Sequence, residues 1–452
     1  MKRLFPTLVF FLASITIQAQ PKNLTIEECL QKAATHNREL QNAAISLQMA
    51  GEQKKEAFTK YFPQISANVL AFKAFDKIIR KEGHFPQELE ALAQVNPQLA
   101  ALAGQPFSIG ELDKGYALMA TVTQPVFVGG QIVNGNRLAN IGKEVAELQL
   151  ELKTEDVLQK VTENFYQIAK LKLNLKTISS AQAQLKEIYR EVKNFVDAGV
   201  TTNNDLLKVT LEIQELASDS IKTTHAKHVL SLLLAQQIGM PGEDIEVSGE
   251  MDFNNETPYP YYVSPEEAIN NRKELMLAKK GVDANKLKVK MEVGKHLPTV
   301  AVGASIFRTG FGGISDAASS IMETTSNNGM VFGTINVPLS AWWGGSHAIK
   351  REKLALKQAE NQLEDTRELL MIDIESAWSG LTEAFAQIGV AITSYNEAKE
   401  NMRMSLEKYR MGTEILSDLL ESETMLRKSE DRLASAAADY LTKLADYRRK
   451  TR

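Results

Sequence analysis

The sequence lacks most of the chemistry that enzymes and disulfide-rich secreted proteins carry. Its single cysteine, Cys29, allows no internal disulfide. It contains no Gly-x4-Gly-Lys-Ser/Thr phosphate loop, no Gly-x-Ser-x-Gly nucleophile turn and no His-Glu-x2-His zinc pair. His225 and His228 are three residues apart, but no third ligand lies near them, so we interpret them as part of a polar helix face. We predict a protein that is not an enzyme and has no cofactor and no metal site.

Strong charge of one sign and long apolar runs are also scarce. The net charge is −4 and no part of the chain is strongly basic, which argues against nucleic-acid binding. After residue 20 no apolar run approaches eighteen residues, so we expect no transmembrane helix. Residues 1–20 differ, because Lys2 and Arg3 precede an apolar run that ends near the small residue Ala19. This pattern predicts a secretory signal peptide, and hence an exported chain.

Two halves of the exported chain repeat the same spacings. The intervals match in pairs of 23 and 74 residues, namely Leu40–Pro63 with Leu275–Pro298, and Pro125–Gly199 with Pro338–Gly412. Only the interval between the two central prolines of each half differs, with 62 residues in the first half and 40 in the second. We predict a duplication, since long insertions in surface loops cost little free energy. Its parts would be a first repeat at 21–239, a connector at 240–262 and a second repeat at 263–452.

Each repeat is predicted to contain a helix, two strands, a very long helix and a return helix. Strands are expected where side chains alternate in character. Long helices are expected where apolar residues recur at heptad-like spacing, which indicates a coiled coil. The first repeat would have strands at about 63–75 and 115–127, a long helix at about 131–197 and a return helix at about 204–238. The second would have strands at about 298–308 and 329–339, a long helix at about 346–410 and a return helix at about 415–449.

The connector is rich in proline, glycine and acidic residues, and we expect one short strand in it, at Ile245–Val247. The four long strands leave two interpretations open. They have the length and alternation of membrane-spanning strands, although a soluble sandwich can show the same pattern. In a membrane, four strands are too few to close a barrel, so several chains would have to share one.

The residues at the predicted helix–strand junctions support the membrane interpretation. Proline occurs at each of the four junctions, where the chain turns without a backbone donor: Pro63, Pro125, Pro298 and Pro338. Aromatic residues also flank the strands, as they do at membrane interfaces: Tyr61, Phe62, Phe127, Trp342 and Trp343. The alternative is that these aromatic residues form an ordinary core between helices and strands.

The repeated order of elements, the junction prolines and two Gly-x5-Asp-Leu-Leu breaks together resemble the TolC-like outer membrane factor family. The breaks run from Gly199 to Asp205 and from Gly412 to Asp418. The resemblance implies a mixed α/β membrane protein that forms a homotrimer. Its twelve-stranded β-barrel would lie in the outer membrane and continue into a periplasmic coiled-coil helical barrel. The connector would form an equatorial belt.

The resemblance also implies roles for residues at the periplasmic tip of the helical barrel. Gly199 and Gly412 would be the turns at which each long helix reverses. Asp205 and Tyr409 correspond to residues that form inter-helix links in the family. The family's link-forming arginine corresponds to Glu414 here, so the pattern is broken.

Arg410 is one candidate substitute for that arginine. Asp418 and Glu421 correspond to the two acidic rings that narrow the family's channel. In a trimer they would place up to six carboxylates in the lumen and favour cations. Their alternative role is to stabilise the start of a helix through its dipole.

We therefore expect an exit duct in the outer membrane that serves a tripartite efflux pump. It would passively export small molecules that an inner-membrane transporter and a periplasmic adaptor deliver. Its partners would be two further copies of the chain, that adaptor, that transporter and outer-membrane lipid. The alternatives are the outer-membrane channel of a type I protein secretion system and, from a different class, a periplasmic coiled-coil adaptor that forms no channel. The sequence does not indicate the exported substrate.

Overall fold

The computed structural model describes residues 22–75, 79–112, 114–248, 261–315 and 320–452. The predicted signal peptide, residues 1–20, lies outside them. The chain divides into two compact units. We call Ala50–Lys143 with Gly281–Ala359 the sheet unit, and the remaining residues (Met1–Met49, Glu144–Lys280 and Glu360–Arg452) the helical unit. Within the described residues, no helix has an apolar stretch that could cross a membrane.

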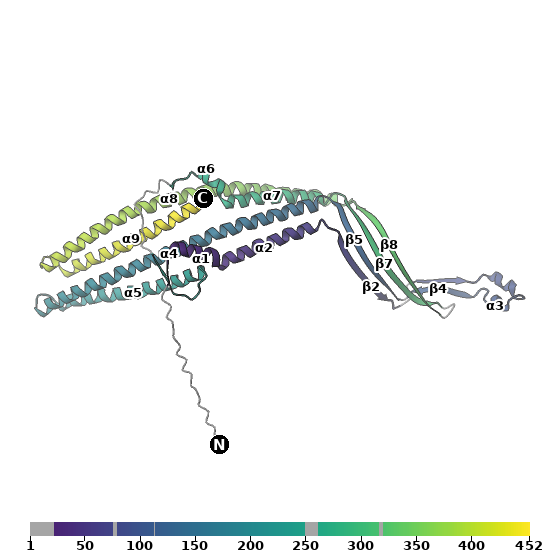
Figure 1. The fold of residues 1–452 in the computed structure, drawn as a ribbon, viewed down its shortest axis with the longest axis horizontal. Coiled ribbons are helices and arrows are strands. Elements are labelled where there is room, and N and C mark those ends of the chain that lie inside the picture. Colours follow the sequence, from purple (N-terminus) through teal and green to yellow (C-terminus); the bar gives the residue numbers. More distant parts are fainter. Residues whose placement is uncertain (1–21, 76–78, 113, 249–260, 316–319) are drawn as a thin grey trace, which may run out of the picture. The chain divides into compact units, whose positions relative to one another are not determined.

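The sheet unit contains a four-stranded antiparallel sheet (Figure 1). Its strands are β2 (Gln64–Lys73), β5 (Lys114–Val128), β7 (Thr299–Ser315) and β8 (Ser320–Asn336), in that order. The central pair, β5 and β7, joins one strand from each repeat. Both repeats therefore build a single sheet.

Strands β7 and β8 are longer than the sequence indicated. β8 begins nine residues before the predicted start, and β7 continues seven residues beyond its predicted end. The added segments are rich in glycine, serine and threonine, which favour turns. They are strands because they pair with each other without a register shift out to Ser315 and Ser320. Ladder hydrogen bonds thus override local preference.

The long interval between β2 and β5 contains structure of its own. It forms a two-stranded sheet from β3 (Ile79–His84) and β4 (Pro106–Leu112). Between these strands lie a 3-10 helix, η1 (Gln87–Leu92), and a short helix, α3 (Pro97–Ala100). The additional residues of the first repeat are therefore a folded excursion from the four-stranded sheet.

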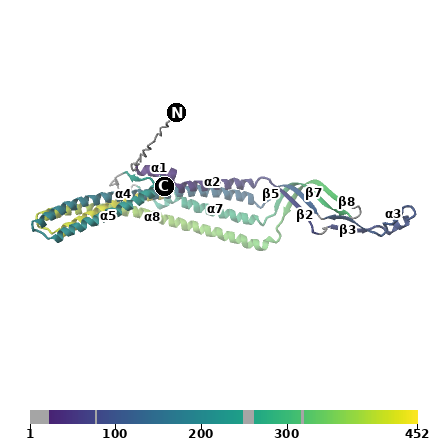
Figure 2. The ribbon, with the colours of Figure 1, turned by 90° about the horizontal axis from the view of Figure 1, so that it is seen from below.

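Each strand of the four-stranded sheet continues into a helix, and the helices form a layer in the same order (Figures 1 and 2). β2 follows α2 (Arg38–Thr59), and β5 leads into α4 (Gln131–Asp197). β7 follows α7 (Lys273–Gly294), and β8 leads into α8 (Ala341–Arg410).

Polar and backbone contacts hold this layer together next to the sheet. The Asn136 side-chain amide donates to the carbonyl of Ala57 on α2 at 2.8 Å. The Gln131 amide donates to the carbonyl of Met291 on α7. A Cβ added at Gly294 would lie 2.0 Å from the carbonyl oxygen of Gly129, so the two backbones touch there. α4 is thereby fixed between α2 and α7.

Three of the four predicted junction prolines flank strands. Pro63 and Pro298 directly precede β2 and β7, and Pro338 follows β8. Pro125 lies within β5 and not at its end, at a register shift between Pro125 and Phe127. A bulge tolerates the missing proline N–H, which explains why the strand continues to Val128.

The helical unit contains most of α4 and α8 together with two return helices, α5 (Asn203–Gln237) and α9 (Leu416–Thr451). It also contains α1 (Ile26–His36), which starts at a capping box formed by Thr25 and Glu28. β1 (Lys22–Leu24) pairs in parallel with β6 (Ile245–Val247), the strand expected in the connector. The second repeat restarts at α6 (Pro265–Ala268) and η3 (Ile269–Asn271).

Candidate functional site

The two faces of the four-stranded sheet differ in chemistry. Aligned rows cross all four strands, and one row is Ile65, Val122, Ala304 and Val331. Ile65 is 78% exposed and Val331 88% exposed. Their face is thus apolar and uncovered in a single chain. Such a surface normally meets lipid or another protein.

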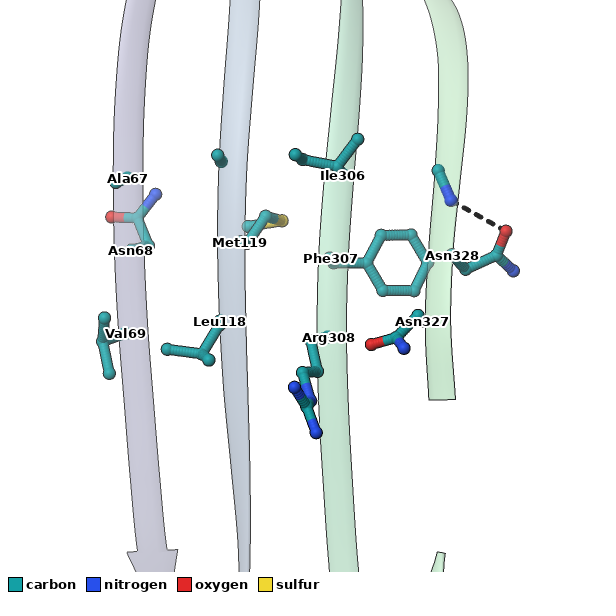
Figure 3. A pocket seen from close by; sticks show the side chains of 12 residues that line it. Ala67, Asn68, Val69, Leu118, Met119, Ile306, Phe307, Arg308, Asn327 and Asn328 are labelled. Atoms are coloured by element: carbon teal, nitrogen blue, oxygen red, sulfur yellow. Dashed lines mark hydrogen bonds between the residues drawn. The ribbon is translucent and has the colours of Figure 1, made fainter. Parts of the chain in front are cut away.

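The opposite face carries hydroxyl and amide groups. The next row consists of Ser66, Thr121, Ser305 and Met330. The Thr121 and Ser305 hydroxyls are 3.1 Å apart and hydrogen-bonded. Figure 3 shows neighbouring rows of the same sheet, where residues from all four strands line a cavity of about 740 Å³, among them Val69, Leu118 and Ile306 of the apolar face. The alternation between an apolar and a polar face is that of a strand between lipid and water.

Aromatic side chains at the strand ends are exposed. Phe62 is 52% exposed and Trp343 is 85% exposed, and Tyr61 and Phe127 also lie at the surface. Within the single chain, these four side chains therefore do not form a buried aromatic core. Their exposure agrees with an interfacial belt.

The reversal of each long helix has the same backbone geometry. Gly199 and Gly412 both have φ of +74°. The Val200 N–H donates to the Phe195 carbonyl at 2.8 Å, and the Thr413 N–H donates to the Lys408 carbonyl at 2.9 Å. Each glycine N–H also donates three residues back. These are two Schellman motifs, which need a glycine at the left-handed position.

The ends of α4 and α8 share one apolar cluster with α5 and α9. Tyr409 is buried in it, and its ring lies 6.2 Å from that of Phe195 in a T-shaped arrangement. Burial, and then the charge of Asp205, raise the pKa of Tyr409. Its side chain therefore contributes mainly packing within the single chain.

The Asp205 carboxylate accepts hydrogen bonds from two residues near the start of α5. The Thr201 hydroxyl donates to its carboxylate at 2.6 Å, and the Lys208 ammonium donates at 3.1 Å. The hydrogen bond from Thr201, together with that from Lys208, lowers the pKa of Asp205. Lys208 also donates to the Ser417 hydroxyl at 3.2 Å, which connects α5 to α9.

Arg410 forms the strongest polar link between the two long helices in this region. Its guanidinium donates to the Glu191 carboxylate on α4 at 2.7 and 3.1 Å. This bond raises the pKa of Arg410. Glu414 accepts a hydrogen bond from Ser405. Arg410 therefore joins α8 to α4 through Glu191, and its role as a substitute in the links at the tip stays a prediction.

Asp418 and Glu421 lie three residues apart near the start of α9, and both are exposed. On the other side of the same helix turns, Leu416 and Leu419 belong to the apolar cluster. Because residues three apart lie on one helix face, the two carboxylates form a single exposed acidic surface. Both positions suit a helix start as well, where acids are stabilised by the dipole.

A buried charged cluster above the tip was not expected from the sequence. Glu423 is 2% exposed, and its carboxylate lies 3.9 Å from the Arg427 guanidinium. Arg427 donates to Glu212 on α5 at 3.2 Å. Burial, more than the nearby Glu212 and Glu430, raises the pKa of Glu423 to about 7. Its heptad position after Leu416 and Leu419 was the available signal, since an acid there must enter the seam.

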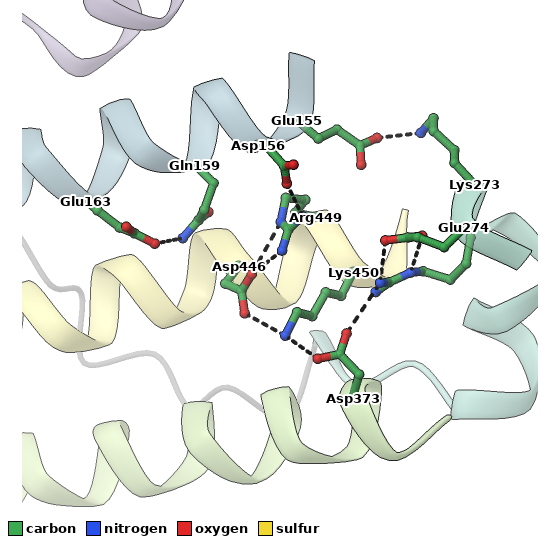
Figure 4. A network of polar contacts seen from close by, with 11 residues as sticks. Glu155, Asp156, Gln159, Glu163, Lys273, Glu274, Asp373, Asp446, Arg449 and Lys450 are labelled. Carbon is green, nitrogen blue, oxygen red and sulfur yellow. Dashed lines mark hydrogen bonds and ion pairs between the residues drawn. The ribbon is translucent and has the colours of Figure 1, made fainter. Parts of the chain in front are cut away.

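A second charged network ties the start of the second repeat to the end of the chain (Figure 4). Arg272 is buried and donates to Glu274 at 2.8 Å, and its guanidinium lies 3.3 Å from Asp373 on α8. Lys450 on α9 donates to the same Asp373 at 2.7 Å. The network anchors α9 beside α8.

No group of three or more potential metal ligands occurs among the residues that the structure describes. His225 and His228 are both exposed on α5. The two imidazoles thus lie on a solvated helix face.

Known proteins similar to this chain are outer membrane channels and efflux proteins. Residues 264–449 match the family model described as outer membrane efflux protein. The chain is 21% identical over 282 residues to the outer membrane protein TolC of Escherichia coli (strain K12). That alignment covers 58% of this chain and 55% of TolC, so it spans about half the length of this relative.

Solved structures share the fold over almost the whole chain. The CmeC outer membrane channel of Campylobacter jejuni matches with a TM-score of 0.71 and 14% identity, over 94% of this chain and 85% of CmeC. The MtrE outer membrane channel of Neisseria gonorrhoeae, in its open state, matches with a TM-score of 0.71 and 14% identity, over 94% of this chain and 88% of MtrE. The second repeat matches the outer membrane efflux protein family, and the whole chain has the TolC-like fold. At these identities the structural matches establish its fold.

Among the described residues no hydrogen bond joins Asp205 to Tyr409 within one chain. Their participation in links between chains stays a prediction, as does the placement of Asp418 and Glu421 at a constriction.

Proposed function

We propose that three copies of this chain form an exit duct through the outer membrane, and that the duct serves a tripartite efflux pump. The observation that carries the proposal is the open four-stranded sheet with one apolar, exposed face. Its outer strands, β2 and β8, each have one neighbour within the sheet. In lipid, unpaired strand edges must find partners. Closure with strands of other copies supplies them.

Dimensions support a membrane location for the sheet. The apolar face runs from Val300 to Ile306 along β7 before Arg308 appears in the same alternation. Seven residues in a strand span about 20 Å, which is close to the height of about 25 Å typical of an outer-membrane apolar band. Three chains give a barrel wide enough for an open lumen, since about eight strands are filled by their own side chains.

The polar face of the sheet would line that lumen. Ser66, Thr121 and Ser305 offer water-like hydrogen-bonding groups without fixed charge. Such a wall passes solutes of varied structure and has no means of driving them. An inner-membrane transporter and a periplasmic adaptor would therefore supply the energy and the cargo.

The proposal is tested by location and stoichiometry. In a Cys29→Ser background, Ser66→Cys on β2 and Thr334→Cys on β8 place one thiol on each outer strand. Oxidation in cells should give linked dimers and trimers in the outer-membrane fraction, and none larger. A monomeric chain in the periplasmic fraction would instead favour the adaptor class. Loss of the gene should also raise intracellular retention of an exported dye, and plasmid-borne gene should restore its export.

A further inference from the structure

A cavity of about 1120 Å³ lies among α2, α4 and α7 in the sheet unit. Cationic side chains dominate its lining, and the only carboxylate among the lining residues is Asp283. The cations come from all three helices: Lys54, Lys55, Arg137, Lys143, Lys286 and Lys290. Their convergence on one cavity creates a local positive field that favours an anion.

Three of these cations have no acidic partner. Lys55 pairs with Glu52 at 2.8 Å, and Lys286 lies 3.4 Å from Asp283. No carboxylate of the described residues lies within 4.0 Å of Lys54, Arg137 or Lys290. Their charges are thus available to a ligand.

The same cavity has an apolar side. Phe58 is 55% exposed, and Tyr61 and Val133 are also exposed within the lining. The Phe58 and Tyr61 rings lie 5.7 Å apart. Exposed aromatic groups beside unpaired cations suit a ligand with an anionic head and an apolar body.

The cavity lies next to the strands. Tyr61 is three residues before the start of β2, and Arg137 is six residues after the start of α4, or about 9 Å along that helix. A bilayer's polar headgroup layer extends about 5–8 Å beyond its hydrocarbon core on each side. Long Lys and Arg side chains reach further along a helix than their Cα atoms.

A second cavity lies over another face of the same helices. On α2 it is lined by Gln53, Ala57 and Lys60, whereas the cationic cavity is lined there by Gly51, Lys55 and Phe58. At 100° per residue these sets point in nearly opposite directions. The second cavity extends to Gln64 and Thr299, which belong to the polar side of the strands. The cationic cavity therefore opens away from the proposed lumen.

We infer that the cationic cavity binds the headgroup of an anionic phospholipid of the adjacent leaflet. The lipid phosphate would contact Lys54, Arg137 and Lys290, and the start of its acyl chains would pack on Phe58, Tyr61 and Val133. The inference rests on the proposed function, since it needs the strands to lie in the membrane. The site would hold the duct at a fixed depth in the bilayer.

The test is lipid binding by the purified full chain in detergent, measured by native mass spectrometry. Phosphatidylglycerol is titrated against phosphatidylcholine, which has no net charge. The test variant is Lys54→Gln with Lys290→Gln. The matched control is Lys288→Gln with Lys357→Gln, which removes two exposed charges of the same unit from outside the cavity.

Wild type should prefer phosphatidylglycerol, and the test variant should bind it about ten- to thirtyfold more weakly. The control should stay within about twofold of wild type. Equal binding of both lipids by wild type, or an equal loss in the control, would overturn the site. Competition by dissolved glycerol phosphate at the concentrations at which the lipid binds would also overturn it, because a membrane lipid would then not be needed.

Subunit mass and outer-membrane fractionation are recorded on the same preparations. A trimer that fractionates with the outer membrane but lacks lipid preference refutes the site and leaves the duct intact. A monomer absent from the outer membrane refutes the duct, and the lipid site with it.

Discussion

Gly199 and Gly412 reverse the two longest helices with the same φ of +74° and the same Schellman hydrogen bonds. Neither glycine has a neighbouring atom within 4 Å of the position that a Cβ would occupy. They are therefore needed for backbone conformation and not for space. The duplication of the chain explains why the same solution occurs twice.

A first prediction compares Gly412, which is required by its positive φ, with Gly294, which is required by lack of space. Gly412→Ala should cost about 1 kcal/mol, the penalty of a left-handed alanine. Gly294→Ala should cost more, because its Cβ would lie 2.0 Å from a backbone oxygen that has no freedom to rotate away. Thermal unfolding of the two variants beside wild type checks the order. A larger loss for Gly412→Ala would contradict it.

The apolar face of the sheet gives a second prediction. Val331 lies on that face, and Met330, its neighbour in sequence, lies on the polar face. Val331→Arg should therefore destabilise the inserted protein by up to about 4 kcal/mol, the cost of arginine facing lipid near the bilayer centre.

Met330→Arg is the matched control and should cost much less, since its side chain would face water. Denaturant titration in lipid vesicles measures both variants. Equal costs would mean that the two faces meet the same solvent.

The buried Glu423 gives a prediction about pH. Its folded-state pKa of about 7 lies above the usual 4.5. The folded state therefore binds this proton more tightly, and the stabilisation present below about pH 4.5 is lost as the pH rises through 7. Glu423→Gln should gain stability relative to wild type between pH 5 and pH 8, by up to about 3 kcal/mol.

Melting temperatures at pH 5 and pH 8 measure this difference. Glu215→Gln, an exposed change on α5, is the control and should show no such trend. A difference in melting temperature between Glu423→Gln and wild type that does not vary with pH would contradict the raised pKa of Glu423.

The link between Arg410 and Glu191 gives a prediction about the tip. Both side chains are partly exposed, so the pair should contribute no more than about 1 kcal/mol. Arg410→Ala should raise the open fraction of the channel up to about fivefold in bilayer recordings. Glu191→Ala should have a similar effect, and the double variant should add little. Additive effects would show that the two residues act separately.

Much of the fold followed from patterns that local chemistry imposes. The glycine breaks, the heptad spacing and the Ile245–Val247 strand depend on nearby residues, and the structure contains all three. The full length of β8 depends on pairing with β7, which no local pattern contains. Pro125 was misplaced for the same reason, since its tolerance comes from a bulge between two strands.

In the candidate site, too, some features depend on nearby residues and others on contacts between distant segments. Arg410 could be selected from its position in the sequence, whereas its partner Glu191 is 219 residues away and appears only when α4 and α8 pack. The surroundings of Glu423 likewise form only when α9 packs beside α5, which brings Glu212 to Arg427. Contacts between copies of the chain, on which the roles of Asp205 and Tyr409 depend, are a property of the assembly.

The most direct test of the account is single-channel recording in a planar bilayer under a KCl gradient. Wild type and Arg410→Ala should both give discrete, cation-selective steps, and the variant should be open for a larger fraction of the time. Asp418→Ala with Glu421→Ala should lose most of that selectivity, since both exposed carboxylates would be gone. Glu215→Ala should keep it. Folded trimers of wild type and Arg410→Ala that give no current, or give anion-selective steps, would contradict the account.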